Sequence, residues 1–444
     1  MKRSLPKKGI KAAIGALTLG AVMGLMGACT PKTQTTTEAG SRSGGDTVTL
    51  ELWHIQSTDP FPGIIQGSAD RFMAANPNVK VNITMVANDA YKQKLAVAMS
   101  SGRMPDIFIS WSGGPMNEYA KAGTIADLTA YMNAQGYKDT FLDAAINQAT
   151  YQGKMYGVPV ENVAVCTVFY NKEIFARYGF QIPTTIRQLE AICDTLVQNG
   201  IKPFSLANKT QWTGSMYFMH FAARRGGIGP FAQALEGTGS FEDPSFVYAG
   251  TKIQEWVNKG YYNTGFNGLD EDSGQSRQLL YTGDAAMTIM GSWFISTVYG
   301  ENPEFAQKIG LFNFPADESG VGNPNTVIGT IGDNFYHVAS TSKAPDKAFE
   351  LITYLLDEQA VTERIAAGRI PPLKEVNLSD PLLAELFAQV QAAPDMQLWY
   401  DQSLSPEVAE VHKTTSQEIF GGTMSPETAA QRLQAAQAAY LSKR

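Results

Sequence analysis

Residues 47–109 read TVTLELWHIQSTDPFPGIIQGSADRFMAANPNVKVNITMVANDAYKQKLAVAMSSGRMPDIFI. Apolar and polar side chains alternate over 48–52 and again over 79–85, which is typical of half-buried strands, and residues 105–109 read as a short buried strand. Strand, helix, strand, helix, strand predicts an α/β fold with a largely parallel sheet and right-handed crossovers. The two intervening helices are expected at about residues 63–75 and 90–101.

A second α/β stretch opens at Val158. Its last helix should begin at Ser425-Pro426-Glu427, where a capping residue precedes proline and an acidic residue in the first turn. Residues 46–444 are long enough for two domains with a core each. The other expected elements are a strand at 160–170, a helix at 185–198, an apolar run at 284–290 and a helix at 345–356.

The start of the chain has the layout of an export signal. Five basic residues within the first eleven precede an apolar stretch, 12–28, that holds no acidic residue. Residues 25–29 (LMGAC) resemble a bacterial lipobox, which predicts a lipoprotein signal peptide at 1–28 and a lipid on Cys29. Residues 29–45 lack large apolar side chains and should form a flexible tether. A plain signal peptide with an incidental cysteine is the alternative.

The charge balance bears on possible partners. Formal net charge is −7, and removal of residues 1–28 leaves −12, because that segment carries five basic and no acidic residues. An acidic body argues against nucleic acid and against direct binding to anionic lipid. We therefore expect the Cys29 lipid to hold the protein on the outer face of the cell membrane. Cys166 and Cys193 read as buried thiols, although a disulfide between them stays open.

Recognised catalytic and cofactor motifs are missing from the sequence. It contains no GxxxxGK[ST], HExxH, GxSxG or CxxC pattern, and its four histidines show no metal spacing. The turn at 270–274 (DEDSG) faintly resembles a calcium loop, but its glycine stands one place early and the closing glutamate is missing. We interpret it as a solvated acidic turn. The sequence therefore predicts no enzyme, no cofactor and no metal.

Aromatic residues stand beside polar ones at the ends of predicted strands and in loops, at Trp53-His54, Trp111, Trp212, Trp293 and Trp399-Tyr400-Asp401. A sugar ring has apolar faces and a rim of hydroxyls, so its site needs flat rings for stacking and carboxylates or amides for hydrogen bonds. Trp256 is expected in the core instead. The candidate ligand contacts are Trp53, His54, Trp111, Glu161, Trp212, Trp293, Asp333, Trp399 and Asp401.

Residues 46–444 resemble the family 1 extracellular solute-binding proteins, the sugar-capturing lipoproteins of bacterial ABC importers. The resemblance rests on an ordered set of segments, and residues 397–423 further resemble the multiple-sugar and raffinose-type subgroup, which implies α-galactosides or α-1,6-glucosides. Trp293 and the Trp399–Asp401 segment match family sugar contacts, and Asp333 matches a subgroup carboxylate. The ordered segments are SGRMPDI (101–107), GKMYGVP (153–159), YNK (170–172), GDAAM (283–287), GSW (291–293) and AFEL (348–351).

The resemblance implies two α/β lobes, each with a mainly parallel sheet, around a ligand cleft. The expected crossings between lobes fall near Pro159-Val160, Phe312–Pro315 and Arg369–Pro372. It also implies an oligosaccharide ligand, permease subunits as partners, and a monomer. A binding protein for another solute, which would need a strongly charged pocket, and a secreted glycoside hydrolase remain as alternatives. Lobe 1 is thus expected from residues 46–159 and 315–369, and lobe 2 from 160–314 and 370–444.

Overall fold

The computed structural model describes residues 47–443, so the predicted signal peptide, tether and Cys29 lie outside the described residues. Asp46–Arg444 form one compact unit. Two separate hydrophobic cores within it correspond to two lobes, each built on its own sheet. No helix between residues 47 and 443 combines the length and apolarity that a membrane span needs.

Lobe 1 is built on a five-stranded sheet in the order β2-β1-β3-β12-β6. Leu50 and Leu52 of β1 are fully buried in a core that also holds Phe72 and Leu95 of the two following helices. The strands are β1 (Val48–His54), β2 (Val79–Met85), β3 (Ile107–Ser110), β6 (Val158–Pro159) and β12 (Phe335–Val338). The strand–helix alternation predicted for residues 47–109 is confirmed, and β1 pairs in parallel with β2 and with β3.

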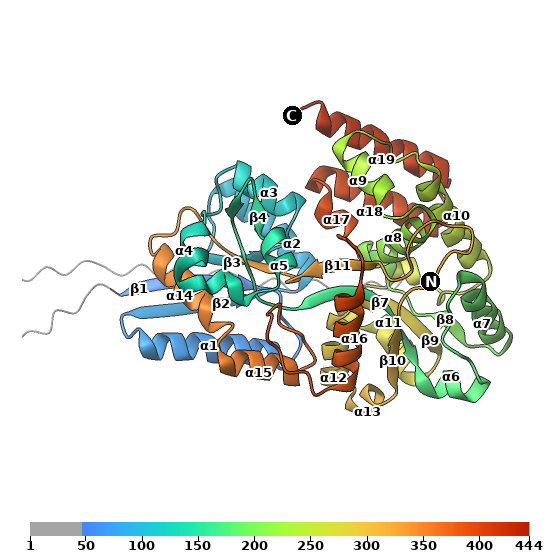
Figure 1. Ribbon diagram of the computed structural model, residues 1–444, viewed down its shortest axis with the longest axis horizontal. Coiled ribbons are helices and arrows are strands. Elements are labelled where there is room, and N and C mark those ends of the chain that lie inside the picture. Colours follow the sequence, from blue (N-terminus) through green and yellow to red (C-terminus); the bar gives the residue numbers. More distant parts are fainter. Residues whose placement is uncertain (1–46, 444) are drawn as a thin grey trace, which may run out of the picture. The chain divides into compact units, whose positions relative to one another are not determined.

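Helices from both ends of the chain cover the lobe 1 sheet. Figure 1 shows the blue α1 beside the orange α14 and α15, and α1 contacts both of these late helices. The helices of the first stretch are α1 (Phe61–Ala75), α2 (Asn88–Ser101), α3 (Gly114–Lys121), α4 (Thr129–Asn133) and α5 (Asp143–Gln148), and β4 (Thr150–Tyr151) and β5 (Lys154–Met155) form a small hairpin. The late helices are α14 (Pro345–Tyr354) and α15 (Glu358–Ala366).

Lobe 2 is built on a six-stranded sheet around β7, which is buried along nearly its whole length. β7 runs antiparallel to β9, β10 and β11, and in lobe 1 β12 runs antiparallel to β3 and β6. The prediction of mainly parallel sheets is therefore wrong, because β7, β11 and β12 each follow the preceding strand without the helical crossover that parallel pairing requires. The strands are β7 (Val163–Asn171), β8 (Lys202–Phe204), β9 (Ala285–Gly291), β10 (Ile309–Phe312), β11 (Val327–Ile331) and β13 (Met396–Gln397).

The helices of lobe 2 begin at the predicted signals. Thr185 and Ser425 each accept a hydrogen bond from a backbone N–H in the first turn of the helix that follows, which satisfies a donor left free at the helix start. Cys166 and Cys193 are buried free thiols. The helices are α6 (Lys172–Tyr178), α7 (Ile186–Gln198), α8 (Trp212–Gly226), α9 (Gly229–Glu236), α10 (Pro244–Asn258), α11 (Gln275–Thr282), α12 (Trp293–Glu301), α13 (Pro303–Ala306), α16 (Pro381–Ala392), α17 (Tyr400–Ser403), α18 (Pro406–Phe420) and α19 (Pro426–Leu441).

The chain passes between the two sheets at residues 160–162 and again at 332–334. The second crossing lies later than the predicted Phe312–Pro315, because β11 still belongs to lobe 2, where Ile331 pairs with Val163 of β7. A third crossing follows α15, which packs on α1, and precedes α16, which packs on β10. The predicted boundary of lobe 2 at residue 314 is therefore too early.

Glu161 and its neighbour Asn162 join all three crossings. The Glu161 carboxylate accepts hydrogen bonds from Arg364 Nη1 at 2.6 Å and Arg369 Nη1 at 2.7 Å, and from Tyr336 Oη at 2.7 Å. Asn162 accepts from the backbone N–H groups of Gly332 at 2.8 Å and Ile370 at 2.9 Å. Glu161 and Arg364 have no exposed surface. Burial by itself would raise the pKa of the Glu161 carboxyl, but the two guanidinium groups hold it below its ordinary value.

Candidate functional site

A cavity of about 220 Å³ lies between the lobes, where the carboxyl end of β1, the N-terminal parts of α2 and α8, and the 332–334 crossing meet. Lobe 1 supplies Trp111 and residues 55–58, and lobe 2 supplies most of the aromatic lining. Six of the nine predicted contacts line this cavity: Trp111, Trp212, Trp293, Asp333, Trp399 and Asp401. Residues far apart in sequence thus form one site.

Trp293 owes its position to the Gly291-Ser292-Trp293 turn at the end of β9. A Cβ on Gly291 would lie 2.2 Å from the Trp293 ring, so only glycine lets the indole fold back over the strand. Ser292 Oγ donates to the Val163 carbonyl at 2.7 Å and accepts from Asn162 Nδ2 at 3.1 Å. This turn therefore ties the Trp293 ring to β7 and to the first crossing.

Three tryptophans form the apolar wall of the cavity. The rings of Trp212 and Trp293 meet edge-on with centroids 6.0 Å apart, and those of Trp293 and Trp399 are tilted with centroids 5.8 Å apart. Trp399 is 3% exposed, and its Nε1 donates to Thr330 Oγ1 at 3.3 Å. Mutual contact holds the rings in fixed orientations, and the half-buried Trp212 and Trp293 present apolar surface to the cavity without rearrangement.

Asp333 lies in the second crossing with its backbone at φ 53°, in the left-handed region. Its carboxylate lines the cavity and accepts no hydrogen bond from the residues that the structure describes. Burial raises the pKa of Asp333 to about 7; nearby Arg369 opposes this rise and Glu161 adds to it. An unpaired, largely desolvated carboxylate on a strained backbone is a cost to folding that points to a functional role.

We expect Asp333→Asn to stabilise the ligand-free protein at pH 8 by on the order of 1 kcal/mol. A carboxyl whose pKa is raised on folding disfavours the native state increasingly as pH rises from about 4, its unfolded value, to about 7. The stability gained by Asp333→Asn should therefore decrease as the pH falls toward 4. Urea unfolding of both proteins between pH 4.5 and 8 measures it, and a gain that does not depend on pH would contradict the assignment.

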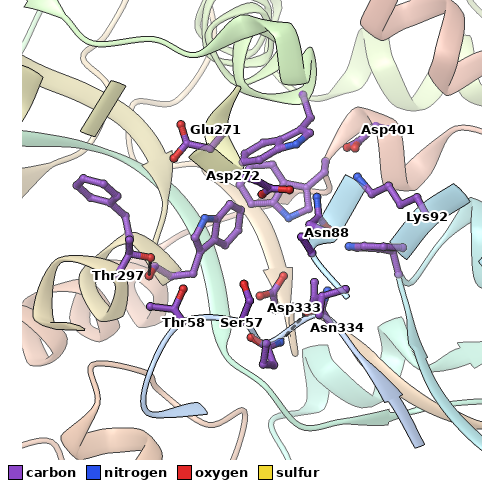
Figure 2. Close-up of a pocket in the computed structure, with 18 of the residues that line it drawn as sticks. Ser57, Thr58, Asn88, Lys92, Glu271, Asp272, Thr297, Asp333, Asn334 and Asp401 are labelled. Atoms are coloured by element: carbon purple, nitrogen blue, oxygen red, sulfur yellow. Dashed lines mark hydrogen bonds between the residues drawn. The ribbon is translucent and has the colours of Figure 1, made fainter. Parts of the chain in front are cut away.

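The Asp401 carboxylate likewise lines the cavity and has no hydrogen-bond donor among the described residues. It lies on α17, which Tyr400 fixes in place by stacking on Phe231 with ring centroids 3.8 Å apart. Figure 2 shows Asp401 and Lys92 toward one end of the cavity and Glu271 and Thr297 toward the other. The Lys92 Nζ lies 4.9 Å from the centroid of the Trp111 ring.

The acidic turn 270–274 also reaches the cavity, contrary to its interpretation as solvated. Glu271, 7% exposed, accepts from Arg277 Nη1 at 2.7 Å and Ser276 Oγ at 2.9 Å, while the exposed Asp272 also lines the cavity and interacts with the Asp89 backbone. The site is therefore more charged than expected. The two arginines that line the cavity nevertheless form ion pairs within the protein. Arg277 pairs with Glu271 and Glu301, and Arg369 pairs with Glu161.

Three predicted contacts do not line the cavity. Trp53 lies under the Lys94 ammonium, 3.8 Å from the ring centroid. His54 is 1% exposed, its Nδ1 accepts from the Gln56 backbone N–H at 3.1 Å, and burial lowers its pKa to about 4. Glu161 is the buried acceptor at the crossings. We therefore leave these three residues out of the proposed ligand contacts.

Sequence reasoning missed most of the polar lining. Residues 56–58 lie in the loop after β1, only a few positions beyond the predicted Trp53-His54, so the end of this strand marks the correct loop. Gln56 Nε2 donates to Asn334 Oδ1 at 3.1 Å and links that loop to the second crossing. The remaining unpredicted polar lining residues are Asn88, Lys92, Glu271, Asp272, Arg277, Thr297, Arg369 and Gln402.

Chemically, this arrangement favours binding of a polar ligand with apolar faces. Within residues 47–443 no group of three His, Cys, Asp or Glu side chains is placed to hold a metal ion. Free carboxylates beside fixed indole rings can accept hydroxyl hydrogens while the rings cover C–H faces.

The family of the chain follows from comparison with known proteins. A model of the bacterial extracellular solute-binding proteins matches residues 56–362, and the chain belongs to this family. It is thus a binding protein and not an enzyme, as the sequence predicted. An uncharacterized ABC transporter extracellular-binding protein of Pyrococcus horikoshii is 24% identical over 416 residues, which cover 92% of this chain and 88% of that protein.

Solved structures agree on the two-lobe α/β fold. One, from work on xylan utilization by the thermophilic bacterium Caldanaerobius polysaccharolyticus, is 30% identical with a TM-score of 0.82, covering 87% of this chain and 99% of that one. A chitin oligosaccharide binding protein is 26% identical with a TM-score of 0.81, covering 88% and 98%. The raffinose complex of a solute-binding protein, at 23% identity and a TM-score of 0.73 over 88% and 99%, supports the fold alone.

Proposed function

We propose that this protein captures a neutral oligosaccharide in the cavity between its lobes and delivers it unaltered to the permease of an ABC importer. The observation that carries the proposal is the juxtaposition of three mutually packed indoles with the unpaired carboxylates of Asp333 and Asp401. The rings suit the apolar faces of sugar units, and the carboxylates suit their hydroxyl rims.

Binding of a sugar in the cavity would cause the two lobes to close. A sugar held against the lobe 2 tryptophans gains further contacts with Trp111 and residues 56–58 only when lobe 1 is near. The difference in binding free energy between the open and closed forms is what shifts the population toward closure. The permease would then recognise the closed form, which is the form that holds bound sugar.

Two sugar classes are candidates. Resemblance of residues 397–423 to the raffinose-type subgroup favours α-galactosides or α-1,6-glucosides. β-Linked oligosaccharides are the second candidate, because the chitin oligosaccharide binding protein and the structure from the xylan work are more similar in sequence and in fold than the raffinose complex.

Calorimetry of the protein from Asp46 onward tests this proposal. Raffinose, stachyose, isomalto-, malto-, xylo- and chito-oligosaccharides form the panel, and at least one should give a 1:1 isotherm with no shortened products on later analysis. Binding of raffinose or isomaltose-type sugars alone would select the first class, and binding of xylo- or chito-oligosaccharides alone the second. Cleavage of the sugar, or tight binding of only a charged solute such as a polyamine, would contradict the proposal.

We further propose that a lipid on Cys29 holds the protein at the outer face of the membrane. The basic and apolar sequence before Cys29 and the polar, small-residue sequence after it support this. Cys29→Ala should abolish both lipid labelling and cleavage at that position, and the protein should no longer fractionate as a processed lipoprotein. Labelling with a fatty-acid analogue measures this, and a processed, lipid-bearing Cys29→Ala protein would contradict it.

A further inference from the structure

The lobes touch each other beyond the crossings, at the rim of the cavity. There the turn Ser112–Gly114, which follows β3 and begins α3 in lobe 1, packs against the end of α17 in lobe 2. A second link lies close by, where Tyr440 Oη of α19 donates to Glu118 Oε1 of α3 at 2.8 Å. Because neither link belongs to a crossing, both can separate when the lobes move apart.

The contact at this turn is between backbones. A Cβ on Gly113 would lie 2.3 Å from the Gln402 carbonyl oxygen, and one on Gly114 would lie 1.9 Å from the Leu404 carbonyl oxygen. Both distances are far inside van der Waals contact, and the colliding atoms are main chain that cannot rotate aside. The lobes therefore reach this approach only with glycine at both positions.

The element on the other side of this contact also forms part of the cavity. α17 spans Tyr400–Ser403, and its Asp401 and Gln402 side chains line the cavity. The carbonyl oxygens that face the glycines belong to Gln402 and to Leu404, which ends the helix. α17 therefore contributes both to the cavity and to the surface that lobe 1 meets, so one rigid element presents both.

We propose that Gly113-Gly114 and the end of α17 form a closure latch, a contact that exists only in the closed form and that couples an occupied cavity to lobe closure. The coupling to a sugar rests on the proposed function, whereas the latch itself concerns only the two lobes. Without the latch, ligand would bind mainly to lobe 2, and the apparent affinity would fall with the fraction of closed protein.

Gly114→Ala is the sharpest test. Gly114 opens α3 before Pro115 and has no positive φ, so alanine is tolerated there when the lobes are apart. Gly229→Ala is a matched control, because Gly229 opens α9 before Pro230, also without positive φ, and a Cβ there meets nothing within 4 Å. Gly113 is less informative, since its φ of 73° strains any substitution in the open form as well.

Two measurements distinguish an effect on lobe closure from an effect on sugar binding. Spin labels at Ala96→Cys on α2 and Ala435→Cys on α19, both exposed positions, report the distance between lobes with and without ligand. Calorimetry with whichever panel sugar the wild type binds reports affinity. Gly114→Ala should shift the ligand-free distances toward longer values and weaken sugar binding by about tenfold or more, with an unchanged ligand-free melting temperature. Gly229→Ala should match the wild type throughout.

Unchanged lobe distances in Gly114→Ala would overturn the latch, even if sugar affinity fell for another reason. A drop in the ligand-free melting temperature of Gly114→Ala relative to Gly229→Ala would also overturn it, because the contact would then belong to the permanent fold. Should the wild type bind no sugar of the panel, the proposed function fails, while the ligand-free distances still decide the latch.

Discussion

Glu161→Gln is expected to lower the free energy of unfolding by about 3–5 kcal/mol, the usual cost of breaking a buried ion pair. The substitution leaves Arg364, which has no exposed surface, and Arg369, which has little, without their shared carboxylate. Because Glu161 connects the first crossing to the third and, through Tyr336, to β12, the loss should destabilise both lobes together. Urea unfolding at pH 7 followed by circular dichroism measures it.

The stability effect of Glu161→Gln should change with pH in a defined direction. The folded pKa of Glu161 lies below its ordinary value, so its stabilisation is complete above the unfolded pKa, about 4.3, and is lost as pH falls through the folded pKa. The difference in the free energy of unfolding between wild type and Glu161→Gln should therefore become smaller as the pH falls. Glu304→Gln is the control, because Glu304 is 85% exposed in its pair with Lys308 and should change stability by at most about 0.5 kcal/mol. Equal effects of the two substitutions would contradict the account of the crossings.

Asp401→Ala should weaken sugar binding by roughly 10- to 150-fold, which corresponds to the loss of a hydrogen bond to a charged group at about 1.5–3 kcal/mol. Asp401→Asn should lose less, because the amide keeps one acceptor. Trp293→Ala should cost about 2 kcal/mol or more, as a buried tryptophan anchor at a binding surface typically does. Calorimetry with the tightest sugar of the panel measures all three variants.

Trp256→Ala provides the contrast to Trp293→Ala. Trp256 is fully buried in lobe 2, stacks on Phe204 with centroids 5.3 Å apart, and donates from Nε1 to Glu190 at 2.9 Å. Its removal should lower the melting temperature strongly, because large aromatic-to-alanine changes in cores cost about 3–5 kcal/mol. The protein that remains folded should bind sugar normally. If Asp401→Ala and Trp293→Ala both keep wild-type affinity, the proposed site is misplaced.

Local pattern was enough to predict much of the fold. Alternation at 48–52 and 79–85 located β1 and β2, and the capping signal at Ser425 located the start of α19, because these features depend on neighbouring residues only. Strand direction was not predictable in the same way. β7 and β12 enter their sheets at crossings between the lobes and pair antiparallel there, and local pattern predicts no strand at β11, so the predicted second crossing falls too early.

The same distinction between local pattern and distant contacts applies to the residues of the site. Trp293, Trp399 and Asp401 were identifiable because short motifs carry them and the family resemblance reinforces them. Glu271 and Asp272 were not, since an acidic turn has the same local appearance whether it faces solvent or a cavity. Glu161 was assigned to the ligand, although its arginine partners come from residues more than 200 positions away and cannot be foreseen from its own segment.

A crystal structure with the tightest-binding sugar of the panel tests the central claim most directly. The account predicts an intact oligosaccharide in the cavity, with a sugar face against Trp293 or Trp399 and hydroxyls donating to Asp401. A sugar bound elsewhere on the protein, with the cavity holding only solvent, would contradict it.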